Sequence, residues 1–293
     1  MSSIPRGNLL LIALITLVWG FNWPIMKTVL REFPPFTFRS LCMAAGAVGL
    51  FAIAKFNKLP LAVPRGQWPR LIASALFNIT GWNLLIAFGL THMAAGRGVI
   101  LAYTMPIWTI LLSIIFLHEK LTGRRALGLL FGMAAMIILV STEFAQLRAA
   151  PLGALLVVGA ALSWSIGTVV MKRFPISLPT TSMTGWTMLL GGLPIWIATP
   201  FFERGAVHEV TLWPFLGVIY NMTLAVIFCY WAWNKLISSG SASVTALSTL
   251  MIPVLGVFSS MLLLGEQPRW QEFVALGLVL VTLMLVMLPI TKK

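Results

Sequence analysis

The chain alternates between long apolar runs and short polar gaps from its first helix to its last. A helix needs roughly 20 predominantly apolar residues to cross the hydrocarbon core of a bilayer. Ten such runs lie near 8–30, 35–55, 68–90, 97–117, 124–142, 151–173, 180–200, 211–235, 243–263 and 271–289. Because the gaps leave no room for a folded extramembrane domain, the pattern predicts an all-α integral membrane protein with ten transmembrane helices.

The composition supports the same class. Of the 293 residues, 59% are hydrophobic and 9% are charged, and the mean hydropathy is +0.96. A soluble protein carries far more surface charge, so lipid is the expected solvent for most of this surface. Cys42 and Cys229 both fall inside predicted helices and lack metal-ligand spacing, which predicts packing roles. The sequence therefore predicts neither a metal nor a cofactor.

The net charge of +13 does not indicate a nucleic-acid partner, because the basic residues are scattered through the gaps. With ten helices and the N-terminus inside, 13 Lys and Arg residues face the cytoplasm and 7 face outward. The outward set is Lys27, Arg31, Arg39, Arg97, Arg148, Arg204 and Arg269. By the positive-inside rule, we expect a multi-pass protein of the cell (inner) membrane with both termini cytoplasmic.

Matched residues recur in the two halves of the chain at a spacing near 145. In each half a tryptophan is followed eight residues later by a lysine, and a proline precedes a glutamate by thirteen. The matched sets are Trp19, Lys27, Pro106 and Glu119 in one half and Trp164, Lys172, Pro253 and Glu266 in the other. Each proline interrupts an apolar run, so we expect both prolines to lie mid-helix.

Such self-similarity predicts an internal duplication. Five helices per copy is an odd number, so the second copy must enter the membrane from the opposite side. Inverted repeats of this kind are the architecture of many secondary transporters. The sequence therefore predicts two inverted five-helix repeats, 1–145 and 146–293, around a central cavity.

The matched residues also resemble the EamA-type family of the drug/metabolite transporter superfamily. The resemblance rests on Trp19-Gly20, Lys27, Pro34 and Arg39, and on the two Pro-then-Glu segments 103–119 and 251–266. Within this superfamily the chain is most similar to the YddG-type exporters of aromatic amino acids. That resemblance implies a ten-helix fold, a central cavity between the halves and transport without ATP hydrolysis.

Aromatic and amide side chains deep in the predicted helices are the candidates for lining a pathway. A buried indole N–H needs a partner that lipid tails do not offer, and an amide in mid-membrane is unfavourable unless it is hydrogen-bonded. The candidate substrate-binding residues are Trp19, Asn22, Asn78, Trp82, Asn83, Tyr103, Trp108, Trp164 and Thr168. Trp186 and Asn221 are also expected to face the interior. Helix-to-helix packing is the alternative for each of them.

A smaller set is expected to move or to seal the pathway. A proline removes a backbone hydrogen bond and loosens a helix, so Pro106 and Pro253 are hinge candidates, with a static bend as the alternative. Lys27 and Lys172 either extend to the interface or bind a substrate carboxylate or stabilise a gate. Glu119 and Glu266 are expected to cap the helix that follows each of them rather than to couple ions.

These features favour a transporter that exports amino acids or related small amphipathic and aromatic metabolites by alternating access. An amide and aromatic lining suits such a substrate, and rings add cation–π contact with an ammonium group. A nucleotide sugar, a phosphorylated sugar or a lipophilic cation on the same fold is the alternative. The chain has no catalytic or Walker A motif, so an enzyme is not expected. The expected partners are a small-molecule substrate and the lipid bilayer, and a monomer is compatible with this interpretation.

Overall fold

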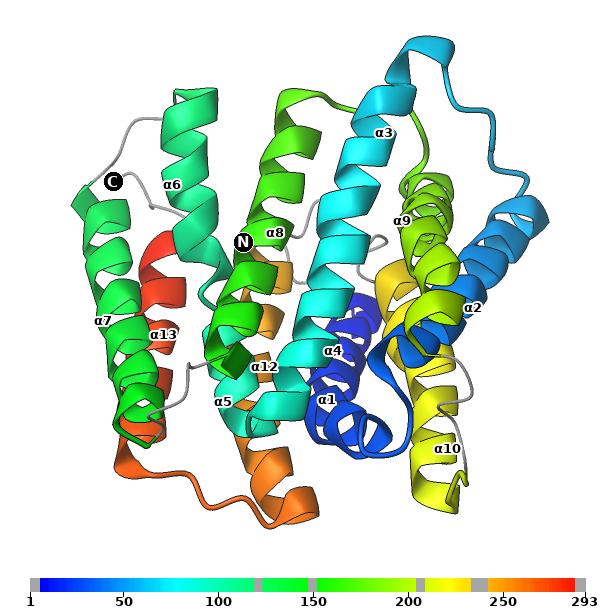
Figure 1. Cartoon of the computed structure of the whole chain (residues 1–293). Helices are drawn as coiled ribbons and strands as arrows, with labels where there is room; N and C mark the ends of the chain where they lie inside the picture. The colour runs from blue at the N-terminus through cyan, green and yellow to red at the C-terminus, as the bar shows by residue number, and fades with distance from the viewer. Residues whose placement is uncertain (1–5, 119–122, 147–151, 204–208, 233–241, 288–293) are drawn as a thin grey trace.

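The computed structural model of the chain describes residues 6–118, 123–146, 152–203, 209–232 and 242–287, which form helices and connections without any strand. Figure 1 shows these helices packed side by side in one bundle. Seven helical stretches among the described residues are long and apolar enough to cross a membrane, namely Leu10–Val29, Pro35–Phe56, Arg65–His92, Ala95–Leu117, Leu152–Met171, Thr180–Phe202 and Leu212–Ala232. Ala126–Ala135, Ile252–Leu264 and Trp270–Thr282 are shorter apolar helices. The all-helical prediction is confirmed, and the count of ten spans stays a prediction.

The first half of the chain contains five long rods. In chain order its elements are α1 (Arg6–Val29), α2 (Pro35–Phe56), η1 (Arg65–Gln67), α3 (Trp68–Ala75), η2 (Leu76–Gly81), α4 (Trp82–His92), α5 (Ala95–Ala102), α6 (Met105–Leu117) and α7 (Gly123–Gln146). Here η1 is a 3₁₀ turn, and η2 is a π-helical segment inside the continuous rod from α3 to α4.

The second half repeats this plan. Its elements are α8 (Leu152–Arg173), α9 (Thr180–Phe202), α10 (Leu212–Tyr220), η3 (Asn221–Phe228), α12 (Ala242–Leu264) and α13 (Trp270–Met287). The segment η3 is π-helical like η2, and the two begin 145 residues apart, at Leu76 and Asn221. A π-helical turn is rare and frequently lies at a functional site, so this match at the repeat spacing is notable.

The main packing pairs join one half of the chain to the other. α2 lies along α9, α1 along α12 and α7 along α13, while α8 packs on α4 and α6. Small residues permit the closest approach, as is usual between membrane helices. At Gly191 of α9 a Cβ would fall 2.5 Å from the Cβ of Ile79 and 2.7 Å from the carbonyl oxygen of Ala75. Only glycine allows α9 to lie this close to the rod of α3 and η2.

Prolines affect the helices in different ways. Pro24 lies inside α1 and leaves the carbonyl of Gly20 without its usual N–H donor. Ser259 of α12 donates to that carbonyl at 3.2 Å, so the partner helix satisfies the freed group.

The matched prolines of the two halves are not equivalent. The fourth rod breaks at Tyr103, and α6 begins at Met105 with Pro106 in its first turn. A proline there loses no helical hydrogen bond, so the predicted mid-helix position of Pro106 is wrong. α12 runs unbroken through Pro253, which is buried.

The bundle has two distinguishable ends. At one end the α1–α2, α4–α5, α9–α10 and α12–α13 connections meet, at the bottom of Figure 1. We call it the α4–α5 end. The α2–α3 and α8–α9 connections meet at the opposite end, at the top of Figure 1, which we call the α2–α3 end.

Arg39 departs from the sequence prediction. It was counted among the charges of the first outer loop, but it lies in the second turn of α2 and its side chain is only 5% exposed. The predicted apolar run 35–55 already contains position 39, so the helix is as expected and only the loop placement of this charge is wrong.

Candidate functional site

Three predicted pathway residues meet where α8 packs on the rod of η2 and α4. The rings of Trp82 and Trp164 lie edge to face with centroids 5.2 Å apart. Asn78 of η2 donates from Nδ2 to the Trp164 carbonyl at 3.1 Å, while its buried Oδ1 has no hydrogen-bond partner in the part of the chain that the structure describes. The sequence expected these residues to point into the bundle, and the structure brings them together.

The other candidates of this region make mostly local contacts. Asn83 donates from Nδ2 to the Ile79 carbonyl at 2.9 Å, and Thr168 donates to the Trp164 carbonyl at 2.9 Å. Tyr103 is half-buried at the break between α5 and α6. The indole N–H of Trp108 is buried and has no hydrogen-bond partner among the described residues. Of these four, Trp108 keeps an unused polar group in the interior.

A second cluster surrounds α1. Trp19 donates from its indole N–H to the Ala225 carbonyl of η3 at 3.0 Å, and its ring meets Tyr230 edge-on with centroids 6.0 Å apart. Asn22, three residues further along α1, has a buried Oδ1 without a hydrogen-bond partner among the described residues. Sequence reasoning found Trp19 and Asn22 but missed Tyr230, which carries no motif of its own.

Arg39 joins this second cluster from α2. It donates from Nη2 to the sulfur of Met26 in α1, and its guanidinium carbon lies 4.7 Å from the centroid of the Phe38 ring. Cys42 and Tyr230 are the titratable groups near enough to act on it electrostatically. Among the described residues no carboxylate pairs with Arg39.

The α4–α5 connection is clamped by two charged side chains. Lys27 of α1 donates from Nζ to the carbonyl of Leu90 and to that of Met93, the latter at 2.7 Å. Glu266, after α12, accepts from the backbone N–H of Ala95 at 2.9 Å and from that of Gly96 at 3.0 Å. The cation thus meets the C-terminus of α4 and the anion meets the N-terminus of α5, as the helix dipoles favour. We call these contacts the Lys27–Glu266 clamp.

Further carboxylates reinforce the same end. Arg97 of α5 forms a salt bridge from Nε to Glu272 Oε1, and Glu272 Oε2 accepts from the backbone N–H of Arg269 at 2.6 Å. Glu203, after α9, accepts from the N–H of Phe36 at 2.9 Å and from that of Thr37 at 2.7 Å, at the start of α2. Four carboxylates therefore bind separate elements here, because Glu32 also accepts from Thr211.

Some predicted positions fall elsewhere. Trp186 donates to the Leu61 carbonyl at 2.8 Å and packs on Trp68, so it lies at the α2–α3 end and not deep in the interior as expected. Asn221 is buried as predicted and donates to the Gly217 carbonyl of its own helix at 3.0 Å. Glu119 lies outside the described residues, as do the side chains of Pro106 and Lys172.

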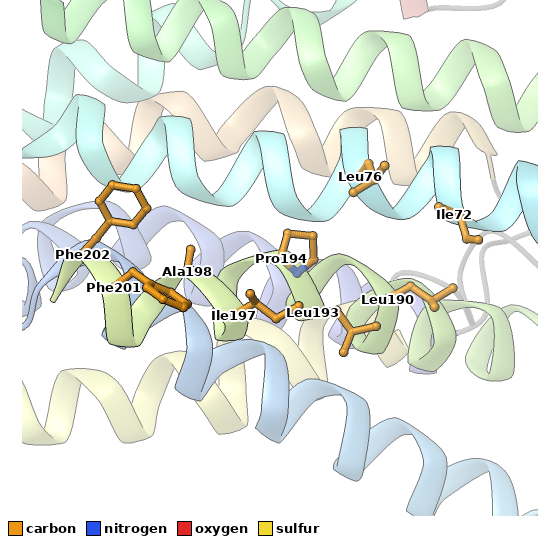
Figure 2. A pocket seen from close by; sticks show the side chains of 9 residues that line it. All are labelled: Ile72, Leu76, Leu190, Leu193, Pro194, Ile197, Ala198, Phe201 and Phe202. Atoms are coloured by element: carbon orange, nitrogen blue, oxygen red, sulfur yellow. The ribbon is translucent and has the colours of Figure 1, made fainter. Parts of the chain in front are cut away.

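Figure 2 shows an apolar groove of about 640 Å³ between α3 and α9 that is separate from both clusters. Its lining is wholly apolar: Ile72, Leu76, Leu190, Leu193, Pro194, Ile197, Ala198, Phe201 and Phe202. Ile197, Phe201 and Phe202 are 64–74% exposed on the outer surface of the bundle. A groove that offers no polar group and opens outward suits acyl chains of lipid better than a polar solute.

Comparison with known proteins identifies related transporters. The model of the EamA-like transporter family matches residues 6–141 and again residues 151–288. YoaV of Bacillus subtilis, an uncharacterised transporter, is 28% identical over 86% of this chain and 87% of its own. A probable amino-acid metabolite efflux pump of Escherichia coli is 27% identical over 94% of this chain and 92% of its own. One solved crystal structure aligns over 96% of both chains with a TM-score of 0.69 and 19% identity, which shows the fold alone.

Proposed function

Because the chain belongs to the EamA-like transporter family, we propose that it exports amino acids or related small amphipathic and aromatic metabolites by alternating access, without ATP hydrolysis. The family and the named relatives are membrane transporters rather than enzymes. The observation that carries the substrate class is the cluster around α1, in which the rings of Trp19 and Tyr230 lie near two polar groups. These polar groups are the Oδ1 atom of Asn22 and the guanidinium of Arg39. The E. coli relative, a probable amino-acid metabolite efflux pump, supports the same class.

Alternating access rests on ten helices arranged as two inverted repeats, residues 1–145 and 146–293. The double match to one family model supports the duplication, and so do the two π-helical segments 145 residues apart. The two copies then exchange conformations, which opens the pathway to one side and closes it to the other.

Two loop contacts support the inversion. Glu32 accepts from Thr211 at 2.6 Å, and Gln67 donates to Ser177 at 3.1 Å. Residue 177 lies 145 positions after residue 32, and residue 211 lies 144 positions after residue 67. The whole of α2 separates Glu32 from Gln67, and the whole of α9 separates Ser177 from Thr211. Equivalent residues thus lie at opposite ends of the bundle, which is the geometry of an inverted copy.

The Lys27–Glu266 clamp supports a gate at the α4–α5 end. It ties α1 and the α12–α13 connection to the α4–α5 turn through four hydrogen bonds that involve a charged group. Bonds of that type are roughly twice as strong as neutral ones, so they hold this end closed in the conformation described. By the positive-inside rule we assign this end to the outer face of the inner membrane and both termini to its cytoplasmic face.

Hinge roles follow from the helix geometry. The break at Tyr103 and Thr104 ends the helix α5, whereas α12 stays helical on both sides of Pro253 and loses only the one backbone hydrogen bond that a proline cannot donate. We assign the larger bending motion to the α5–α6 break beside Pro106, and a smaller one to Pro253. Lys172, equivalent to Lys27 in the repeat, is the corresponding gate candidate in the second copy.

The direct test is counterflow in liposomes. Purified protein is reconstituted with labelled phenylalanine, threonine and methionine, each with and without an imposed pH gradient. We expect saturable exchange of at least one amino acid and no dependence on the gradient, because no deep carboxylate or histidine occurs in the sequence to relay protons. If none of the three exchanges faster than in empty liposomes, the substrate class is wrong.

A further inference from the structure

Arg39 is a buried charge without an anionic partner. Its side chain is 5% exposed, and its Nε–H has no hydrogen-bond partner among the described residues. Its contacts there are the sulfur of Met26, the ring of Phe38 and the neutral thiol of Cys42, and none of them carries a negative charge. A thioether is only a weak acceptor, and a buried charge is strongly unfavourable unless it is paired. Such a charge between membrane helices marks a substrate path.

An unused acceptor lies one helical turn from the Arg39 contact. The Oδ1 atom of Asn22 is buried and has no hydrogen-bond partner among the described residues. Asn22 and Met26 are four residues apart in α1, so they share a face with about 5–6 Å between their Cβ atoms. Because Arg39 touches Met26, an unpaired donor and an unpaired acceptor lie close together on this face of α1.

Two aromatic rings complete the cluster. Trp19 precedes Asn22 by three residues on the same face of α1, and its ring meets Tyr230 at 6.0 Å. The phenol of Tyr230 is also close enough to Arg39 to interact with it electrostatically. A cation, an amide oxygen and two aromatic rings therefore converge between α1, α2 and the helical residues that follow η3.

Resting on the proposed function, we infer that Arg39 and Asn22 bind the charged head group of an α-amino acid. Arg39 binds the carboxylate, which replaces the sulfur of Met26 as its acceptor, and the guanidinium geometry suits a carboxylate in two-point contact. Asn22 Oδ1 accepts a hydrogen bond from the ammonium group. Trp19 and Tyr230 contact the side chain of the substrate. Met26 is adjacent to Lys27, so a movement of α1 that opens the clamp also changes the contact between Met26 and the guanidinium.

Substrate analogues test this assignment on the unmodified protein. Counterflow of labelled phenylalanine is competed with phenylalaninamide, which lacks the carboxylate, and with 3-phenylpropionate, which lacks the ammonium group. We expect each analogue to inhibit roughly 10- to 100-fold more weakly than phenylalanine, the usual effect of one lost charged hydrogen bond. Equal inhibition by phenylalaninamide would overturn the role of Arg39, and equal inhibition by 3-phenylpropionate that of Asn22.

Substitutions assign the discrimination to individual residues. Arg39→Met removes the cation but keeps an apolar side chain of similar length, and Arg31→Met removes an exposed arginine of the same end as its matched control. We expect Arg39→Met to abolish the preference for phenylalanine over phenylalaninamide, Arg39→Lys to retain part of it, and Arg31→Met to retain all of it. Asn22→Ala is expected to abolish only the preference over 3-phenylpropionate.

A merely structural role for Arg39 gives a different result. Arg39→Met would then unfold at a lower temperature in detergent, and its remaining transport would still prefer phenylalanine over phenylalaninamide as the wild type does. That combination would show that the inference is wrong. If the variant does not fold, the analogue series on the wild type and Asn22→Ala decides. Failure of the wild type to move any amino acid refutes the proposed function together with this inference. Transport of phenylalanine without discrimination against phenylalaninamide refutes this inference alone.

Discussion

The two ends of the bundle are held together by different chemistry. At the α4–α5 end, four carboxylates and Lys27 bind backbone groups or an arginine on separate elements. At the described part of the α2–α3 end, Gln67 exchanges neutral hydrogen bonds with Ser177, and the Trp186 indole donates to the Leu61 carbonyl. Charged hydrogen bonds in partly buried sites are stronger than exposed neutral ones. If the protein works by the proposed alternating access, this difference between the described parts of the two ends predicts that the barrier to opening lies mainly at the α4–α5 end.

Cys42 offers a native probe of that barrier. It is fully buried in α2, one helical turn from Arg39. Replacing the equally buried Cys229 with alanine leaves one cysteine in the chain. The rate at which a membrane-impermeant maleimide labels Cys42 then reports how often the α4–α5 end opens.

The largest effect is expected from Glu266→Ala. The substitution leaves the N–H groups of Ala95 and Gly96 without their acceptor and frees the start of α5. Hydrogen bonds to charged groups contribute about 1.5–3 kcal/mol each, so we expect Cys42 labelling to rise roughly tenfold or more. Glu209→Ala, which removes an exposed glutamate of the same end, serves as the control and should leave the rate unchanged. Equal rates for both variants would show that Glu266 is no part of a gate.

Lys27→Met is expected to act in the same direction but more weakly. The carbonyls of Leu90 and Met93 lose a donor, yet water reaches them once the end opens. We expect labelling of Cys42 to rise about three- to tenfold, in line with a cation at a helix C-terminus. Arg31→Met is the matched control, and a rise in that variant of the same size would mean that net charge alone sets the rate.

Glu203→Gln separates stability from gating. Glu203 caps the N-terminus of α2 through three contacts with Phe36 and Thr37. A lost helix cap typically costs about 1 kcal/mol, so the free energy of unfolding in detergent should fall by about that amount. Cys42 labelling of the folded protein should stay at the parent rate. If labelling of Cys42 rose tenfold instead, Glu203 and the α9–α10 connection would be part of the gate.

The smallest effect is expected at the α2–α3 end. Gln67→Ala removes the exposed pair of hydrogen bonds with Ser177. Exposed surface substitutions usually change stability by less than about 0.5 kcal/mol, and Cys42 labelling should not change. If Gln67→Ala increased labelling as much as Glu266→Ala, the contrast between the two ends would not exist.

The sequence predicted the features that depend on hydropathy and helical spacing. The helical class follows from apolar runs of membrane length. Asn78 and Trp82 reach Trp164, as expected of polar and aromatic groups that lipid cannot satisfy. Glu266 was expected to cap the helix that follows it, and this is wrong: it accepts from the N-terminus of α5, 170 residues earlier in the chain. A one-dimensional pattern cannot identify such a distant partner.

Other features depend on information that hydropathy lacks. Arg39 was counted as a loop charge because a cation near the end of an apolar run looks like a topology signal. The predicted apolar run 35–55 already contained Arg39, and the Pro34-Pro35 pair supports that start, since proline favours the first helical turn. The amino-acid composition of the two π-helical segments does not distinguish them from the α-helices around them. The break at Tyr103 and Thr104 lies just before Pro106, whereas α12 tolerates Pro253, so tertiary packing decides what a proline does.

The inverted repeat is the central claim, and the sidedness of two matched connections, α1–α2 and α8–α9, tests it most directly. Arg31→Cys and Ser177→Cys each add one exposed cysteine to a chain in which Cys42 and Cys229 are alanine. Both are labelled with an impermeant maleimide in right-side-out and in inverted membrane vesicles. We predict that Arg31→Cys reacts only in right-side-out vesicles and Ser177→Cys only in inverted ones. Reaction of both positions from the same side would contradict the inverted repeat and the alternating-access mechanism that rests on it.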